Sequence, residues 1–128
     1  MSKILIVYYS QSGSTEKLAK LIQSEVGGTL ATVADTVDLA EFDTVFVGTP
    51  NHAAGASQPV KDFLASHDLS GKKVVPFCTH GMGGEQNTAS DIAKLCPNST
   101  ILTSFAVKGV ELDSAKAAVL AWLEVVGK

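Results

Sequence analysis

The sequence contains no arginine. All ten of its basic residues are lysines, and 13 acidic residues bring the formal charge to −3. The lysines are scattered singly along the chain, apart from the pair Lys72 and Lys73. Proteins that read DNA or RNA depend on a clustered basic face and on the planar guanidinium of arginine. The sequence therefore argues against a nucleic-acid partner.

Long apolar runs and cysteines are also scarce. No run approaches the ~20 apolar residues that a membrane-spanning helix needs, and the opening segment MSKILIVYYS has no cleavage site of the kind that ends a signal peptide. We therefore expect a cytoplasmic protein without membrane contact. Cys78 and Cys96 are predicted to be buried free thiols and not a disulfide. The length of 128 residues predicts a single domain over residues 1–128.

Short apolar runs alternate with amphipathic stretches along the whole chain. The run Ile4 to Tyr9 is typical of a strand buried on both faces, and an apolar stripe of helical spacing follows from Ser14 to Gly27. Similar strands are expected at 44–48, 73–78 and 99–107, with a weaker one at 29–34 and a single turn at 38–42. This alternation predicts an α/β fold, with a five-stranded parallel sheet covered by helices on both faces.

Three polar segments, at 10–15, 49–58 and 79–87, follow the carboxyl ends of expected strands, so they should share the edge of the sheet where such folds bind ligands. The first segment, SQSGST, offers four hydroxyls, a glycine and the unpaired amides of a helix start, which together suit an anion. The nucleotide-binding patterns GxxxxGK[ST] and GxGxxG are both absent. A terminal monophosphate is therefore the expected ligand of this segment.

Three segments resemble flavodoxins in the order that the family shows, and the third is most similar to the short-chain flavodoxins. ILIVYYSQSGSTEKLAKLI fits the family's strand, phosphate loop and helix, because residues 10–15 match its pattern [ST]-x-[ST]-G-[NS]-T. The other two segments are DTVFVGTPNHAAGASQPVKDFL and GKKVVPFCTHGMGGEQNTASDIAKLCPNSTIL. The resemblance implies a three-layer sandwich with strand order 2-1-3-4-5. It also implies FMN as cofactor and redox proteins as partners.

The resemblance also implies which residues surround the cofactor. The phosphate would be held by Ser10, Gln11, Ser12, Gly13, Ser14 and Thr15. The flavin ring would be flanked by Thr49, Pro50, Asn51, His52 and Gly55 from the second segment, and by Thr79, His80, Gly81 and Gly84 from the third. In the family a peptide carbonyl of the second segment reorients toward N5 of the reduced flavin. Here that peptide lies at Gly55 or at Asn51 and His52.

The chain departs from the family in its aromatic residues, which make up only 6% of the sequence. Flavodoxins usually stack Trp or Tyr on the ring, yet neither the second nor the third segment contains one. His52 and His80 are the planar side chains there. They are either stacking surfaces or solvated rim residues, and His52 could also donate a proton to reduced flavin. We hypothesise that one imidazole, with His52 favoured over His80, lies against the ring and makes the midpoint potential depend on pH.

Three functions remain open at this point. An electron carrier between redox proteins is favoured over an enzyme. The first alternative is a small FMN-dependent reductase that moves electrons from NAD(P)H to a quinone or similar acceptor, and the second is a flavin-free binding domain. No metal site is expected, since Cys78, His80 and Cys96 lack the paired spacing of zinc ligands. A hydrolase is not expected either, since GxSxG is absent.

Overall fold

The computed structural model describes residues 3–10, 13–35, 39–52, 55–56, 58–67, 69–80, 88–108 and 115–126. Its strands are β1 (Ile4–Tyr8), β2 (Thr29–Thr32), β3 (Thr44–His52), β4 (Gly55–Ala56), β5 (Lys73–His80), β6 (Thr100–Ile101) and β7 (Phe105–Lys108). Its helices are α1 (Ser14–Val26), the 3-10 turn η1 (Leu39–Glu41), α2 (Gln58–Ser66), α3 (Thr88–Leu95) and α4 (Lys116–Val125). Helix α1 ends where the sequence predicts, because Gly27 takes a φ of 82° that stops the helix.

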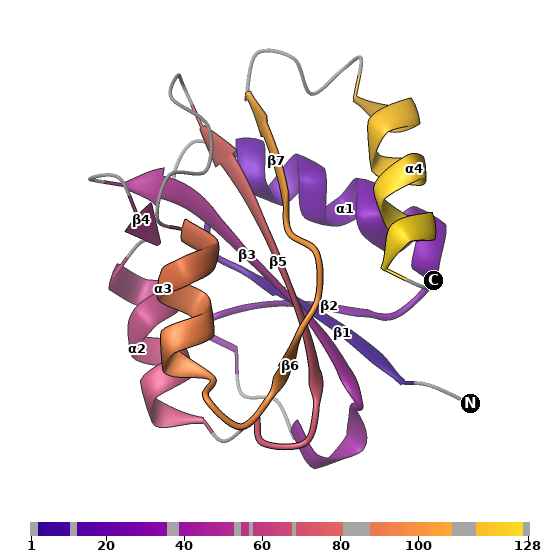
Figure 1. Ribbon diagram of the computed structural model, residues 1–128. Helices are drawn as coiled ribbons and strands as arrows, with labels where there is room; N and C mark the ends of the chain where they lie inside the picture. The colour runs from indigo at the N-terminus through magenta and orange to yellow at the C-terminus, as the bar shows by residue number, and fades with distance from the viewer. Residues whose placement is uncertain are drawn as a thin grey trace.

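The strands form one sheet with the order β2-β1-β3-β5-β6, and β7 also pairs with β5 (Figure 1). Every pair along this path is parallel, as is the β5–β7 pair. Strand β6 pairs with the start of β5 at Lys73 and Val74, and β7 pairs with its end from Phe77 to His80. Since β6 and β7 occupy one position beside β5, the predicted order 2-1-3-4-5 is confirmed, with an interrupted fifth strand.

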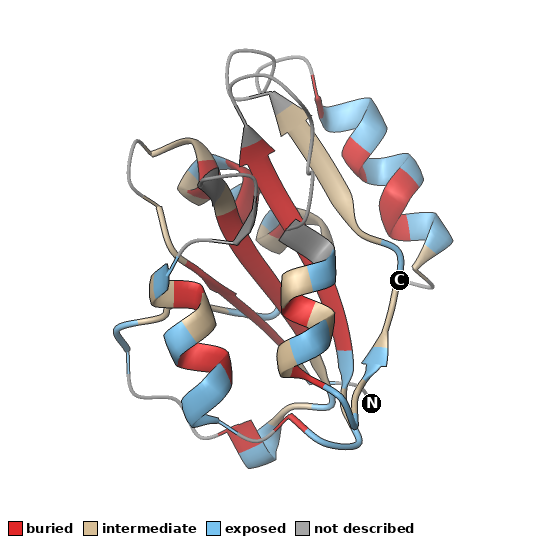
Figure 2. Ribbon diagram, turned by 60° about the vertical axis from the view of Figure 1, so that its left-hand side comes forward, coloured by how far each residue is buried: buried red, intermediate tan, exposed pale blue. Residues whose placement is uncertain are grey.

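The helices cover both faces of the sheet, which gives the three layers that the resemblance implies (Figure 1). On one face α2 and α3 pack over Leu5, Val45 and Val74, and on the other α1 and α4 pack over Ile6, Phe46 and Val75. Figure 2 shows the buried residues running along the central strands and the inward sides of the helices. The alternation of side chains along each strand supplies both cores at once, which is why the strands read as continuous apolar runs.

The second polar segment is more regular than the sequence predicts. An irregular loop was expected from residue 49, but β3 continues to His52 and forms a short antiparallel hairpin with β4, in which His52 pairs with Gly55. Strand β5 likewise continues to His80. The ladder between β3 and β5 extends to the pair Pro50 and Thr79. Backbone hydrogen bonds make this extension, so the apolar pattern of the side chains gives no sign of it.

The two cysteines are buried, as the sequence predicts, and so is the tryptophan. Cys78 and Cys96 are buried thiols outside any disulfide, which confirms the expectation. Trp122 is buried on α4, and its indole Nε1 donates to the carbonyl of Thr103 at 2.7 Å. This bond holds α4 against the segment between β6 and β7.

None of the helices in the described ranges is both long enough and apolar enough to cross a bilayer.

Candidate cofactor site

The polar segments that the sequence singles out follow three neighbouring strands, β1, β3 and β5. Because these strands are parallel, their carboxyl ends lie at one edge of the sheet, and Figure 1 shows the arrowheads of β3 and β5 side by side there. Helix α1 begins six residues after β1 ends. The fold therefore places the start of α1, the β3–β4 hairpin and the end of β5 around a common rim, as predicted.

The start of α1 is shaped by Ser10 and Gly13. Gly13 caps the helix in the left-handed conformation at φ 94°, and its amide donates to Ser10 Oγ at 3.0 Å. The carbonyl of Gly13 accepts the first bond of the helix, from the amide of Lys17 at 3.1 Å. A side chain at this φ would be strained, so the position favours glycine. The hydroxyl of Ser10 uses a lone pair for this bond and keeps its own proton for another acceptor.

The backbone beside Gly13 is open to a ligand. A Cβ built on this residue would meet no atom within 4 Å, so a ligand can approach the backbone closely. The first turn of a helix presents amides that have no acceptor inside the helix, and they carry a partial positive charge of about half an electron. A phosphate monoester matches these donors in charge and in hydrogen bonding. The residues present at this helix start therefore suit the phosphate that the sequence analysis expects.

Three threonines are the buried polar side chains of the described residues, and each belongs to a different one of the three segments: Thr15, Thr49 and Thr79. Thr15 Oγ1 and Thr79 Oγ1 lie 2.8 Å apart and share a hydrogen bond in which either atom can donate. Thr49 Oγ1 donates to the carbonyl of Pro50 at 2.8 Å. These bonds give each of the three buried hydroxyls a partner at the base of its segment.

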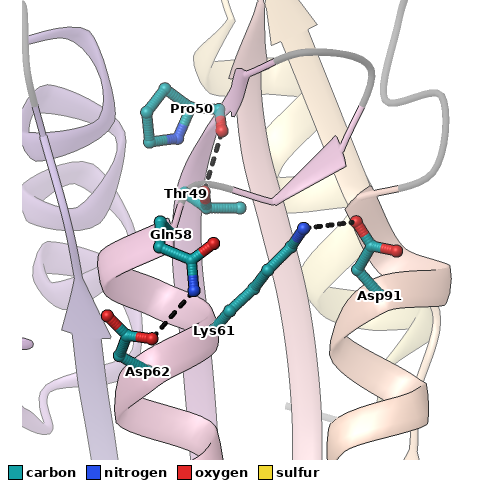
Figure 3. A network of polar contacts seen from close by, with 6 residues as sticks. All are labelled: Thr49, Pro50, Gln58, Lys61, Asp62 and Asp91. Atoms are coloured by element: carbon teal, nitrogen blue, oxygen red, sulfur yellow. Dashed lines mark hydrogen bonds and ion pairs between the residues drawn. The ribbon is translucent and has the colours of Figure 1, made fainter.

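Below the second segment, α2 and α3 are joined by polar contacts (Figure 3). Lys61 Nζ on α2 lies 3.8 Å from Asp91 Oδ2 on α3, which links the two helices. Within α2, Gln58 Nε2 donates to Asp62 Oδ1 at 2.8 Å. Both partners of the ion pair are partly exposed, so its contribution to stability is less than about 1 kcal/mol. The ion pair links two helices that pack beside the β3–β4 hairpin, and neither contact forms a ligand site.

Beneath the helix start, Tyr8 contributes no charge. Burial of its phenol raises the pKa of Tyr8, and the nearby carboxylate of Glu16 raises it further. The phenol is neutral at physiological pH, as an ordinary tyrosine is, and the nearby negative charge is Glu16 in the first turn of α1. Among the described residues, no group of three His, Cys, Asp or Glu side chains gathers as a metal site would require.

The structure places the predicted site residues in three groups. Side chains and backbone are described for Ser10, Gly13, Ser14, Thr15, Thr49, Pro50 and Thr79, all at the rim. Only the strand positions are described for Asn51, His52, Gly55 and His80, so the stacking role of an imidazole stays a prediction. Gln11, Ser12, Gly81 and Gly84 lie outside the described residues. The sequence analysis missed the pairing of Thr15 with Thr79, since a contact between residues 64 positions apart leaves no local signal.

An open parallel sheet with helices on both faces defines a doubly wound α/β protein, and the helix start at its carboxyl edge suits a phosphorylated ligand. Comparison with known proteins gives the family. Residues 5–115 match the flavodoxin domain model, and the chain belongs to the flavodoxin family. A flavodoxin from Clostridium saccharobutylicum is 34% identical over 128 residues, which cover 91% of this chain and 75% of that protein.

Other relatives agree on the family and differ in length. A Synechocystis flavodoxin is 34% identical over 87 residues, and the match spans 60% of this chain but only about half, 51%, of that protein. In structure, the chain is similar to a putative flavoprotein from Bacteroides eggerthii, with a TM-score of 0.84, 25% identity and coverage of 100% and 99% of the two chains. A Lactobacillus acidophilus flavoprotein solved in complex with FMN has the same fold, with a TM-score of 0.69, 19% identity and coverage of 89% and 98%.

Proposed function

We propose that this flavodoxin binds FMN and carries electrons between redox proteins. The observation that carries the proposal is the start of α1, where Gly13 at φ 94° leaves open space beside an amide-rich helix turn, at the same sheet edge as β3 and β5. FMN supplies the redox chemistry when it is bound, and the protein supplies the binding site and the electrostatic environment. The free, buried cysteines agree with a reducing compartment, which supports the cytoplasm as its location.

In this proposal the phosphate group is held by the amides of the first turn of α1 and by hydroxyls of Ser10, Ser14 and Thr15. The positive end of the helix dipole favours a dianion there without any arginine. The ring side of the site is assigned to the β3–β4 hairpin and to the segment that follows β5. The rigid ladder between β3 and β5 reaches Pro50 and Thr79, so both segments start from fixed positions.

The charge of the chain suggests how it meets a partner. A formal charge of −3 is mild, so electrostatic steering toward a basic partner should contribute only modestly to the rate of association. Association should therefore depend weakly on ionic strength. A partner would contact the rim at the carboxyl edge, because the electron must leave through the part of the site that faces solvent.

A second function is favoured by one relative. An NAD(P)H dehydrogenase (quinone) from Rhizobium meliloti is 26% identical over 124 residues, which cover 69% of this chain and 58% of that enzyme. The absence of Trp, Tyr and Phe from residues 49–58 and 79–87 would leave a flavin face accessible to a small substrate. A reductase that takes electrons from NAD(P)H and passes them to a quinone is therefore the alternative to a carrier.

The two functions are separated by the donor that reduces the flavin. For a carrier, the FMN-loaded protein mixed with NADH or NADPH in a stopped-flow instrument keeps its flavin absorbance. After chemical reduction with dithionite, it passes electrons to cytochrome c. Rapid bleaching by NAD(P)H, followed by turnover with a quinone, would establish the reductase instead. A purified protein that binds no FMN would refute both and leave a flavin-free binding domain.

A further inference from the structure

The bond between Thr15 and Thr79 connects two of the three segments of the site. Thr15 lies in the first turn of α1 and Thr79 at the end of β5, and their Oγ1 atoms are 2.8 Å apart. Thr15 is 1% exposed and Thr79 is 4% exposed. Both residues are branched at Cβ, which restricts their side chains to few rotamers. The pair therefore fixes a hydroxyl beneath the helix start at a defined position.

A count of protons shows that this pair has one donor to spare. Two hydroxyl groups carry two protons, and the bond between them uses one. Within the described part of the chain, neither hydroxyl has a further acceptor for the second proton. An unmatched donor at such burial is unfavourable, so a ligand that accepts this proton is stabilised in return. The spare donor lies at the positive end of α1, where the amides of the first turn also favour an anion.

We propose that Thr79 donates its proton to Thr15 Oγ1 and that Thr15 donates its own proton to the phosphate of the cofactor. Thr15 is the member assigned to the phosphate because it belongs to the turn that presents the amides, whereas Thr79 belongs to strand β5. Thr79 is then a positioning residue of the phosphate site, and not the neighbour of the flavin ring that the family resemblance implies. The inference rests on the proposed binding of FMN.

Binding of FMN and of riboflavin to the apoprotein tests the inference, because riboflavin is the same molecule without the phosphate. Isothermal titration would compare the wild type with Thr15→Val, Thr79→Val and the double variant. We expect Thr15→Val to weaken FMN binding by roughly tenfold or more, as for the loss of a hydrogen bond to a charged group. Thr79→Val should weaken FMN binding less, because the Thr15 hydroxyl remains but is no longer held in one orientation by a hydrogen bond. Riboflavin binding should be unchanged in all three.

The double variant shows whether Thr79 acts through Thr15 or contacts the cofactor independently. If Thr79 acts only through Thr15, the double variant binds FMN as weakly as Thr15→Val does. Thr79→Ser should bind FMN as the wild type does, because serine keeps the hydroxyl donor. Thr44→Val is the matched control. It removes a hydroxyl, bonded to Asp43 Oδ1, from the opposite end of β3, and should leave both affinities unchanged. Urea unfolding of each apoprotein shows that the variants fold.

Three results would overturn the inference. Equal weakening of FMN and riboflavin binding would assign the pair to the ring or to general stability. Losses that add up in the double variant would mean that Thr79 contacts the cofactor by itself. Unchanged FMN binding in Thr15→Val would show that the Thr15 hydroxyl does not contact the phosphate. A wild-type apoprotein that binds no FMN would refute the proposed function itself, and that result is visible before any variant is compared.

Discussion

Substitution of Gly48 by alanine should destabilise the protein because the ring of Phe77 occupies the place of the missing side chain. The two residues pair across β3 and β5. A Cβ on Gly48 would overlap Cζ and Cε2 of the Phe77 ring. Carbon atoms in contact are separated by about 3.5 Å or more, so the ring would have to move by about 1 Å. Phe77 is 1% exposed and lies 6.5 Å from the Trp122 ring, so the shift must disturb a packed core.

The size of the effect follows from two opposing contributions. Overpacking of a core costs about 1–3 kcal/mol, and contact with two ring atoms places Gly48→Ala in the upper part of that range. Replacing glycine in a strand returns about 0.5–1 kcal/mol, because alanine loses less backbone freedom on folding. The expected net loss is therefore about 2 kcal/mol, which corresponds to a fall in the urea midpoint of roughly 1 M.

Trp122 gives a direct assay, since it is the single tryptophan of the chain and packs against Phe46, Phe77 and Phe105. Urea unfolding followed by its fluorescence compares Gly48→Ala, Phe77→Leu and the double variant. Leucine removes the ring that clashes, so the double variant should lose at least ~1 kcal/mol less than the two single losses together. Additive losses, or a Gly48→Ala protein as stable as the wild type, would refute the packing explanation.

Three further predictions concern the site and its surroundings. Gly13→Ala should cost about 1–2 kcal/mol of stability through its left-handed φ and weaken FMN binding. Gly71→Ala is the control, because Gly71 has a φ of 78° and open space around it but lies at the opposite end of β5. It should cost the same stability and leave FMN binding unchanged. Potentiometry of His52→Ala should remove a pH dependence of the midpoint potential near pH 6.5, and curves identical to the wild type would contradict the imidazole hypothesis. Burial raises the pKa of the Cys96 thiol from 9.0 to about 11. The thiol of the unfolded chain therefore loses its proton at a lower pH than the thiol of the folded protein, so the free energy of unfolding should fall by up to about 2–3 kcal/mol as the pH rises from 9 to 11. Urea unfolding at several pH values measures this fall, and Cys96→Ala should show a smaller one over the same interval.

The fold follows from signals that are local in the sequence. The run from Ile4 to Tyr8 is buried because it lies at the centre of a parallel sheet, and the stripe of α1 ends at Gly27 because only a positive φ fits there. Neither the β3–β4 hairpin nor the break between β6 and β7 has such a signal. Residues 49–52 read Thr-Pro-Asn-His and lack an apolar pattern. They form a strand through backbone pairing, Thr49 and Pro50 with β5, and Asn51 and His52 with β4.

The site was predictable as a set of segments but not as a set of contacts. A helix start rich in hydroxyls and glycine identifies an anion site, because each of these groups acts on the backbone beside it. The bond between Thr15 and Thr79 depends instead on how α1 crosses the end of β5, which the packing of Leu18 and Ile22 against the sheet decides. Contacts of this kind arise from tertiary packing, and no periodicity of the sequence encodes them.

Aromatic residues are scarce at the rim because those that the chain has lie in the two hydrophobic cores. The one Trp, two Tyr and five Phe all pack in or against the two cores: Tyr8, Tyr9, Phe42, Phe46, Phe63, Phe77, Phe105 and Trp122. No phenyl, phenol or indole group is therefore supplied by residues 49–58 or 79–87. A flavin ring at this edge would meet peptide groups, small side chains and the imidazoles of His52 and His80. Because an imidazole titrates near neutral pH and an indole does not, the protein would tune its cofactor through a group that responds to pH.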